Sequence, residues 1–100
     1  MERILVTYKV KPNRVKENEE LIRAVYAELR QINDLDIHYA TFKLPDGQTF
    51  VHMASFASMD KQPVLTESMA FKAFQENLKD RCEIPPDPQK LEEVDSYNFV

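Results

Sequence analysis

The sequence predicts a single α+β domain, residues 1–100, with the element order strand, helix, strand, strand, helix, strand. Three observations support this fold class. Residues 3–11 and 49–56 alternate side chains with a period of two, as strands do. Residues 13–32 and 67–81 place apolar side chains at helical spacing. The triplet Pro45-Asp46-Gly47 is typical of a hairpin turn, and it predicts that residues 35–44 and 49–56 pair.

The first strand and the first helix are separated by Pro12. Residues 3–11 place Ile4, Val6, Tyr8 and Val10 on one face and Leu5, Thr7 and Lys9 on the other. Asn13 is the predicted N-cap of a helix that extends to about residue 32. The apolar stripe of this helix consists of Val15, Ile22, Val25, Leu29 and Ile32.

The predicted hairpin has two possible registers. If residues 44 and 49 pair, Thr41 lies opposite His52 and Tyr39 lies opposite Ala54, all on one face. A shift of one residue would bring His38 and Ala40 to that face instead. The turn chemistry does not decide between the two registers.

The second half of the chain is predicted to contain a helix and a last strand. Residues 58–62 open a helical region that Pro63 limits to a first turn or a break. The main helix is expected over residues 67–81, with Met69, Ala73, Phe74, Leu78 and Cys82 as its apolar stripe. The proline-rich residues 85–88 are expected to form a rigid connector, and residues 91–99 the final strand.

Composition excludes several classes of function. Thirteen basic and seventeen acidic residues give a net charge of -4, which disfavours nucleic acid as a partner. One glycine is too few for a phosphate-binding glycine loop. The single cysteine and the absence of a signal-peptide pattern lead us to expect a cytoplasmic protein, and no apolar run is long enough to span a membrane. His38 and His52 lack a carboxylate at ligand spacing, so no metal is expected.

The element order is that of a split βαβ or ferredoxin-like fold, a four-stranded antiparallel sheet with two helices on one face. The other face should then be polar in a monomer. Both faces of residues 49–56 are apolar, however, since Phe50 and Phe56 share one face and Val51 and Met53 share the other. We therefore predict a homodimer in which two sheets pack face to face.

The chain resembles the antibiotic biosynthesis monooxygenase-like group of the dimeric α+β barrel superfamily. The resemblance covers nearly the whole chain and is carried by Val10-Lys11-Pro12, an amphipathic helix, the strand containing Tyr39, residues 50–56 and the segment Ser-Met-Ala-Phe-Lys-Ala-Phe at 68–74. It implies two ferredoxin-like sheets paired into a barrel, with a cavity in each subunit. Some members oxidise polycyclic aromatic phenols without a cofactor, others degrade haem, and many have no known activity.

The resemblance does not extend to the haem-degrading members. These carry an asparagine on the first strand, a tryptophan at the end of the third and a histidine before the second helix. The corresponding positions here are Thr7, Phe56 and residues 64–66, and the chain has no tryptophan. No cofactor is therefore expected. Of the cavity residues typical of the quinone-forming members, Tyr39 is the one obvious match.

Two residues are the candidate catalytic groups. The resemblance implies that the face of His52 lines the barrel cavity, where a neutral imidazole could take a proton from a phenolic substrate. Tyr39 could donate a hydrogen bond to a substrate oxygen. Thr7, Thr41 and Phe56 are expected to line the same cavity. The structural alternatives are a histidine hydrogen-bonded across the sheet or the dimer interface and a tyrosine that serves as an ordinary strand residue.

Two classes of function follow from these residues. The first is a monooxygenase-like dimeric barrel protein whose cavity holds a small aromatic or apolar molecule, acting as a cofactor-independent oxygenase. The second is a non-catalytic ligand-binding or stress-responsive dimer whose cavity residues only shape a pocket. The sequence identifies neither the substrate nor the pathway.

Overall fold

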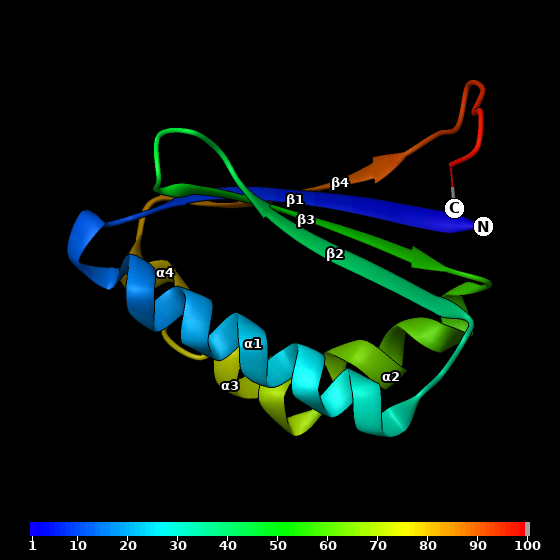
Figure 1. The fold of residues 1–100 in the computed structure, drawn as a ribbon, viewed down its shortest axis with the longest axis horizontal. Helices are drawn as coiled ribbons and strands as arrows, with labels where there is room; N and C mark the ends of the chain where they lie inside the picture. The colour runs from blue at the N-terminus through cyan, green and yellow to red at the C-terminus, as the bar shows by residue number, and fades with distance from the viewer. Residues whose placement is uncertain (100) are drawn as a thin grey trace.

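A four-stranded antiparallel sheet with helices on one face forms the domain, as predicted (Figure 1). The computed structural model describes residues 1–99. The strand order is β2-β3-β1-β4, and every neighbouring pair is antiparallel. The strands are β1 (Glu2–Val10), β2 (Ile37–Lys43), β3 (Thr49–Phe56) and β4 (Cys82–Leu91).

The helical layer consists of one long helix and several short ones. No helix in the described part of the chain is long and apolar enough to cross a membrane. The helices are α1 (Val15–Ile32), α2 (Gln62–Thr66), α3 (Met69–Gln75) and α4 (Leu78–Arg81), with 3-10 turns η1 (Pro12–Arg14) and η2 (Met59–Lys61).

Helix α1 is the predicted first helix, with a different start. Asn13 does not cap it, because Pro12 begins a 3-10 turn that already contains Asn13 and delays the α-helix to Val15. Ile22 and Val25 are buried in the core, as the stripe predicted. Asn33 ends the helix in the left-handed conformation, and its N–H donates to the carbonyl of Leu29 at 2.8 Å.

The second predicted helix, residues 67–81, is wrong as a continuous element. Ser68 adopts extended backbone angles and caps α3 by accepting a hydrogen bond from the Phe71 N–H. Glu76 takes extended backbone angles and ends α3, and Asn77 then takes a left-handed conformation with φ of 62° before α4. As a result Met69, predicted to be in the apolar stripe, is 82% exposed, while Phe74 and Leu78 are buried.

The last strand also differs from the prediction. The proline-rich segment is not a connector but part of β4, and residues 92–99 follow the strand instead of forming it. β4 pairs only with β1, and an edge strand tolerates proline because one side of it needs no N–H donors. The register shifts between Thr7 and Val10 absorb Pro85 and Pro86.

The hairpin adopts the first of the two registers considered. Thr41 pairs with His52 and Tyr39 with Ala54, so the alternative that would bring His38 to this face is wrong. The Leu44 N–H donates to the Thr49 carbonyl at 2.8 Å to close the turn. Gly47 has φ of +72°, a conformation that favours glycine.

The two faces of the sheet have different surroundings. Phe50, His52, Ala54 and Phe56 are all buried beneath the helices of the same chain. The helices of the same chain therefore cover the face of His52, and the second subunit that the sequence predicts would cover the opposite face. Val51 and Met53 lie on the opposite face, which the helices do not cover.

Candidate functional site

His52 lies at the centre of a buried polar cluster between the sheet and the helices. Its side chain extends from β3 toward the helical layer, and the residue is only 5% exposed. The ring stacks on Tyr8, with centroids 5.3 Å apart, and contacts Phe74 with centroids 5.5 Å apart. An imidazole in such surroundings requires hydrogen-bond partners from the protein itself.

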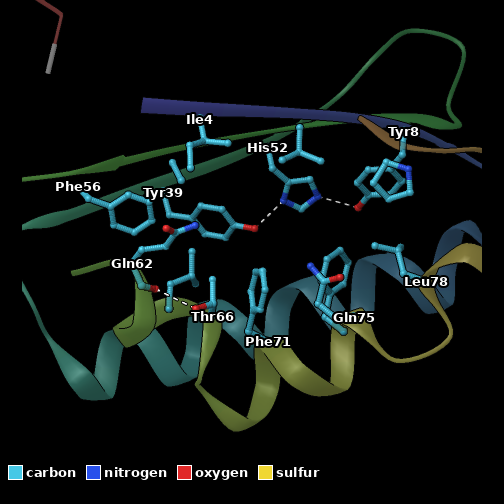
Figure 2. A pocket seen from close by; sticks show the side chains of 15 residues that line it. Ile4, Tyr8, Tyr39, His52, Phe56, Gln62, Thr66, Phe71, Gln75 and Leu78 are labelled. Atoms are coloured by element: carbon cyan, nitrogen blue, oxygen red, sulfur yellow. Dashed lines mark hydrogen bonds between the residues drawn. The ribbon is translucent and has the colours of Figure 1, made fainter. Parts of the chain in front are cut away.

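Both ring nitrogens of His52 have such partners (Figure 2). The Tyr8 hydroxyl lies 2.6 Å from Nε2. The Tyr39 hydroxyl lies 2.7 Å from Nδ1, and the Thr41 hydroxyl lies 3.0 Å from the same nitrogen. The neighbours come from β1 and β2, the two strands that flank β3, so the sheet register places them.

The cluster extends beyond His52 in both directions. Asn18 of α1 donates from Nδ2 to the Tyr8 hydroxyl at 3.0 Å, and Arg81 of α4 donates from Nε to Asn18 Oδ1 at 3.2 Å. On the other side, the Tyr26 hydroxyl lies 2.7 Å from Thr41 Oγ1. A continuous chain of hydrogen bonds therefore joins α4, α1 and three strands through His52.

Burial determines the protonation states in this cluster. It lowers the pKa of His52 from 6.5 to about 4, so the imidazole is neutral near pH 7. Burial also raises the pKa of Tyr8 and of Tyr39 well above 10.0, so both hydroxyls keep their protons. A neutral imidazole can accept a proton, and the two hydroxyls can donate hydrogen bonds.

A cavity of about 100 Å³ adjoins this cluster between the sheet and helices α2 to α4 (Figure 2). Its walls are mainly apolar, and Gln62, Thr66 and Gln75 add polar groups from the helical side. The lining residues are Ile4, Val6, Tyr8, Tyr39, His52, Ala54, Phe56, Gln62, Leu65, Thr66, Phe71, Phe74, Gln75, Leu78 and Pro86. Hydroxyl groups and an imidazole at an apolar cavity are suited to a small ligand that has one polar group.

The structure brings together four of the five residues that the sequence singled out. His52, Tyr39 and Phe56 line the cavity. Thr41 contacts His52, but the expectation that it lines the cavity is wrong, because it lines a separate groove between α1 and β2. Thr7 is the exception, because it pairs with Val51 and its side chain lies on the opposite face of the sheet. The expectation that Thr7 lines this cavity is therefore wrong, since strand alternation places Tyr8 there instead.

Three members of the site were not predicted from the sequence: Tyr8, Asn18 and Arg81. Asn18 offered a usable signal, because it lies within the apolar stripe of α1, three residues after Val15 and four before Ile22. A polar residue in such a stripe is buried and must find a partner. Arg81 gave a similar signal, three residues after the buried Leu78.

Metal binding has no support in the described residues. Among residues 1–99, no three His, Cys, Asp or Glu side chains are grouped so that they could hold a metal ion. The two histidines point to opposite faces of the sheet, since His38 pairs with Ser55 and Thr41 pairs with His52.

Comparison with known proteins identifies the fold. No family model and no curated protein matches this sequence. Solved structures do match over nearly the whole chain. An antibiotic biosynthesis monooxygenase has a TM-score of 0.81 at 14% identity, covering 95% of this chain and all of that one.

Two further structures show the range of names attached to this fold. A protein of unknown function from Nitrosomonas europaea has a TM-score of 0.75 at 14% identity and covers 99% of this chain and 94% of its own. A mutant of SnoaB, a cofactor-independent oxygenase from Streptomyces nogalater, has a TM-score of 0.74 at 10% identity, covering 98% of this chain and 97% of its own. The chain therefore has the fold of the antibiotic biosynthesis monooxygenase-like structures.

Proposed function

We propose that this chain is a monooxygenase-like protein that binds a small hydroxyaromatic molecule in the cavity beside His52 and promotes its oxidation by O₂ without a cofactor. The observation that carries the proposal is a neutral, buried imidazole flanked by two tyrosine hydroxyls at an apolar cavity. The fold that the chain shares with SnoaB supports the same reaction class.

The cavity limits the size of the substrate. Its volume of about 100 Å³ is below the roughly 300–1,000 Å³ of drug-sized pockets. A single aromatic ring therefore suits the enclosed space better than the polycyclic phenols that the family resemblance implies. The apolar walls, including Phe56 and Phe71, would contact the faces and edges of such a ring.

His52 would accept the proton of the substrate hydroxyl. The Tyr8 hydroxyl occupies Nε2, so the proton would reach this nitrogen through Tyr8, while Tyr39 orients the substrate oxygen. The negative charge left on the substrate would raise the pKa of His52, which offsets the effect of burial. With the hydroxyaromatic substrate written as AH₂ and its oxygenated product as AO, the reaction balances as AH₂ + O₂ → AO + H₂O. The substrate supplies all four electrons that reduce O₂, so no external reductant is needed.

Oxygen uptake tests this proposal. Wild type and His52→Ala are compared with a panel of single-ring dihydroxyaromatic compounds. If His52 is the base, the substitution should lower kcat by about 10² to 10⁴. His38→Ala is the matched control, because His38 is exposed on the opposite face. Equal uptake by wild type and a folded His52→Ala variant would remove His52 from the mechanism.

The second candidate is a non-catalytic ligand-binding or stress-responsive protein. It is favoured by the engagement of both ring nitrogens and by the low pKa of His52, which are also features of a purely structural histidine. In that case wild type shows no oxygen uptake with the panel. The same compounds should still bind, as calorimetric titration would show, and His52→Ala should mainly lower stability, by roughly 1–3 kcal/mol.

We further propose that the protein acts as a cytoplasmic homodimer. The support for a reducing compartment is its single cysteine, Cys82, which is a free thiol. The support for a dimer is the apolar face of the sheet, with Val51 and Met53, that the helices leave uncovered.

A further inference from the structure

We propose that Asn18 is a positioning residue that fixes which ring nitrogen of His52 carries the proton, and that the buried guanidinium of Arg81 fixes the orientation of Asn18. The consequence for catalysis rests on the proposed function of His52. The structural claim itself does not, because it concerns the protein without a ligand.

The Arg81 side chain is buried, with the residue only 1% exposed. Its guanidinium donates from Nε to Asn18 Oδ1 at 3.2 Å, from Nη1 to the Glu76 carbonyl at 3.1 Å and from Nη2 to the Phe74 carbonyl at 2.7 Å. A guanidinium has donors and no acceptor. The Asn18 atom that faces it must therefore be the carbonyl oxygen, and the amide nitrogen must face the other way.

That amide nitrogen determines the role of Tyr8. Asn18 is fully buried, and its Nδ2 donates to the Tyr8 hydroxyl at 3.0 Å. Because Tyr8 Oη accepts this bond, its single hydrogen is free to donate. Among residues 1–99, the other hydrogen-bond partner of that hydroxyl is His52 Nε2, at 2.6 Å.

Donation by Tyr8 requires a lone pair on Nε2. The hydrogen of the neutral imidazole must then lie on Nδ1, from which it donates toward Tyr39 and Thr41. In the reverse arrangement Tyr8 Oη would accept two hydrogen bonds, and its own hydrogen would have no acceptor in a buried site. The successive hydrogen bonds from Arg81 to Asn18, from Asn18 to Tyr8 and from Tyr8 to His52 therefore favour a single tautomer of the imidazole. In this tautomer the unprotonated nitrogen, Nε2, faces Tyr8.

The positive charge of Arg81 also acts on the site near Tyr8. Among residues 1–99, no carboxylate lies within ion-pair distance of its guanidinium, and Glu17, whose charge reaches it, pairs with Arg14 at 2.8 Å. A buried guanidinium paired only with carbonyl oxygens keeps its positive field near Tyr8. Such a field favours negative charge on a substrate oxygen bound there.

The substitution Asn18→Asp tests the inference, since it keeps the shape of the side chain and removes its donor. One carboxylate oxygen would accept from Arg81, giving the guanidinium an ion pair, and the other would accept from the Tyr8 hydroxyl. Tyr8 would then accept from His52, so Nε2 must gain a hydrogen. The imidazole nitrogens of ¹⁵N-labelled protein report this directly by NMR at pH 8.

We expect an unprotonated Nε2 in wild type and a protonated Nε2 in Asn18→Asp. An Nε2 that is protonated in wild type, or that stays unprotonated in the folded variant, overturns the inference. Neither measurement involves a substrate, so this result and the oxygen-uptake result can fail independently.

A second variant keeps the inference testable if Asn18→Asp does not fold. Tyr8→Phe preserves the ring that stacks on His52 and removes the hydroxyl that links it to Asn18. We expect the imidazole to change from one tautomer to a mixture of two. An Nδ1–H tautomer that persists alone in Tyr8→Phe would show that Asn18 does not set it. Asn18→Gln, which keeps a donor and an acceptor on a longer side chain, should retain the wild-type Nδ1–H tautomer at least in part. Asn18→Leu, which has neither group, should give a mixture of the two tautomers.

Discussion

Burial of His52 disfavours its charged form because the imidazolium would lose its hydration. The protein replaces water with three hydroxyl groups, and two of them belong to tyrosines whose own pKa values are raised by burial. None of these groups carries a negative charge near pH 7 that could stabilise a cation. The site therefore keeps the histidine neutral, which is the form that a general base requires.

The low pKa of His52 predicts a pH-dependent stability. The unfolded state binds a proton with a pKa of 6.5 and the folded state only at about 4. The stability contributed by the neutral form is fully present above pH 6.5 and is lost as the pH falls toward 4. The loss should total about 3 kcal/mol. Urea unfolding of wild type at several pH values between 7 and 4 measures it.

The control for this prediction separates His52 from the carboxylates that also titrate in the acid range. His52→Gln should unfold with a shallower pH dependence between 6.5 and 4, while His38→Gln should keep the wild-type slope. Parallel curves for all three proteins would contradict the assignment of this stability change to His52.

Two short turns hold the elements that form the cavity, and the first is the β2–β3 hairpin. The Thr49 hydroxyl, together with the N–H groups of Gln48 and Thr49, donates to the Asp46 carboxylate and lowers its pKa to about 2. The register that this turn sets places Thr41 opposite His52. A slip of one residue would remove Tyr39 and Thr41 from the site.

Gly47→Ala should destabilise the protein by about 1–2 kcal/mol, because the residue has φ of +72°. A new Cβ would meet no atom within 4 Å, so backbone strain is the only cost. Gly47→Asn is the matched variant, since asparagine tolerates this conformation better. In thermal unfolding, Gly47→Asn should have a higher Tm than Gly47→Ala. An alanine variant as stable as wild type would argue against strain at this position.

The second turn is the start of α3, which carries Phe71, Phe74 and Gln75 along the cavity. Ser68 accepts from the Phe71 N–H at 3.2 Å and donates to the Leu65 carbonyl at 2.7 Å. Ser68→Ala should cost about 1 kcal/mol. Hydrogen exchange should show faster opening of α3, and Ser68→Thr, which keeps a hydroxyl that can both accept and donate, should retain its protection. Unchanged exchange in Ser68→Ala would assign the stability of this helix start to Glu28, which accepts from the Ala70 N–H at 2.8 Å.

Periodicity predicted the elements whose hydrogen bonds are local or lie within one hairpin. It predicted α1, the hairpin, and the face shared by Phe50, His52 and Phe56, but it left two hairpin registers open, of which the structure adopts the one that pairs Thr41 with His52. It failed where tertiary contacts overrule local preference. The proline-rich β4 is a strand because β1 offers it an edge, and α3 is separated from α4 because Asn77 accepts a left-handed conformation.

The site was only partly predictable for the same reason. His52 and Tyr39 stood out because they share a strand face with apolar neighbours. Arg81 and Asn18 are 63 residues apart, and no local pattern brings them together. The tertiary fold, which brings Arg81 of α4 within hydrogen-bond distance of Asn18 of α1, completes the hydrogen-bond chain to Tyr8.

The helices leave one face of the sheet uncovered (Figure 1). Leu5, Val51 and Met53 lie on this face, and Phe42 beside them is 57% exposed. In the segment that follows β4, Glu93 pairs with Arg3 at 2.7 Å and the Phe99 ring lies 5.2 Å from the Arg3 guanidinium, at one end of this face. A contiguous apolar sheet face of this kind is a candidate interface.

We expect a second copy of the chain to cover this face, because the same apolar patch on two subunits is complementary to itself under twofold symmetry. A standard interface would bury about 800 Å² of each subunit. Light scattering at micromolar concentration should give twice the chain mass of 11.7 kDa.

Val51→Lys should convert the protein to a folded monomer, since a lysine in the middle of a packed sheet interface would be buried without a partner. Met69→Lys is the matched control, because Met69 is 82% exposed on the helical side, and it should leave the mass unchanged. A monomeric wild type, or a Val51→Lys variant that keeps the wild-type mass, would contradict pairing through this face.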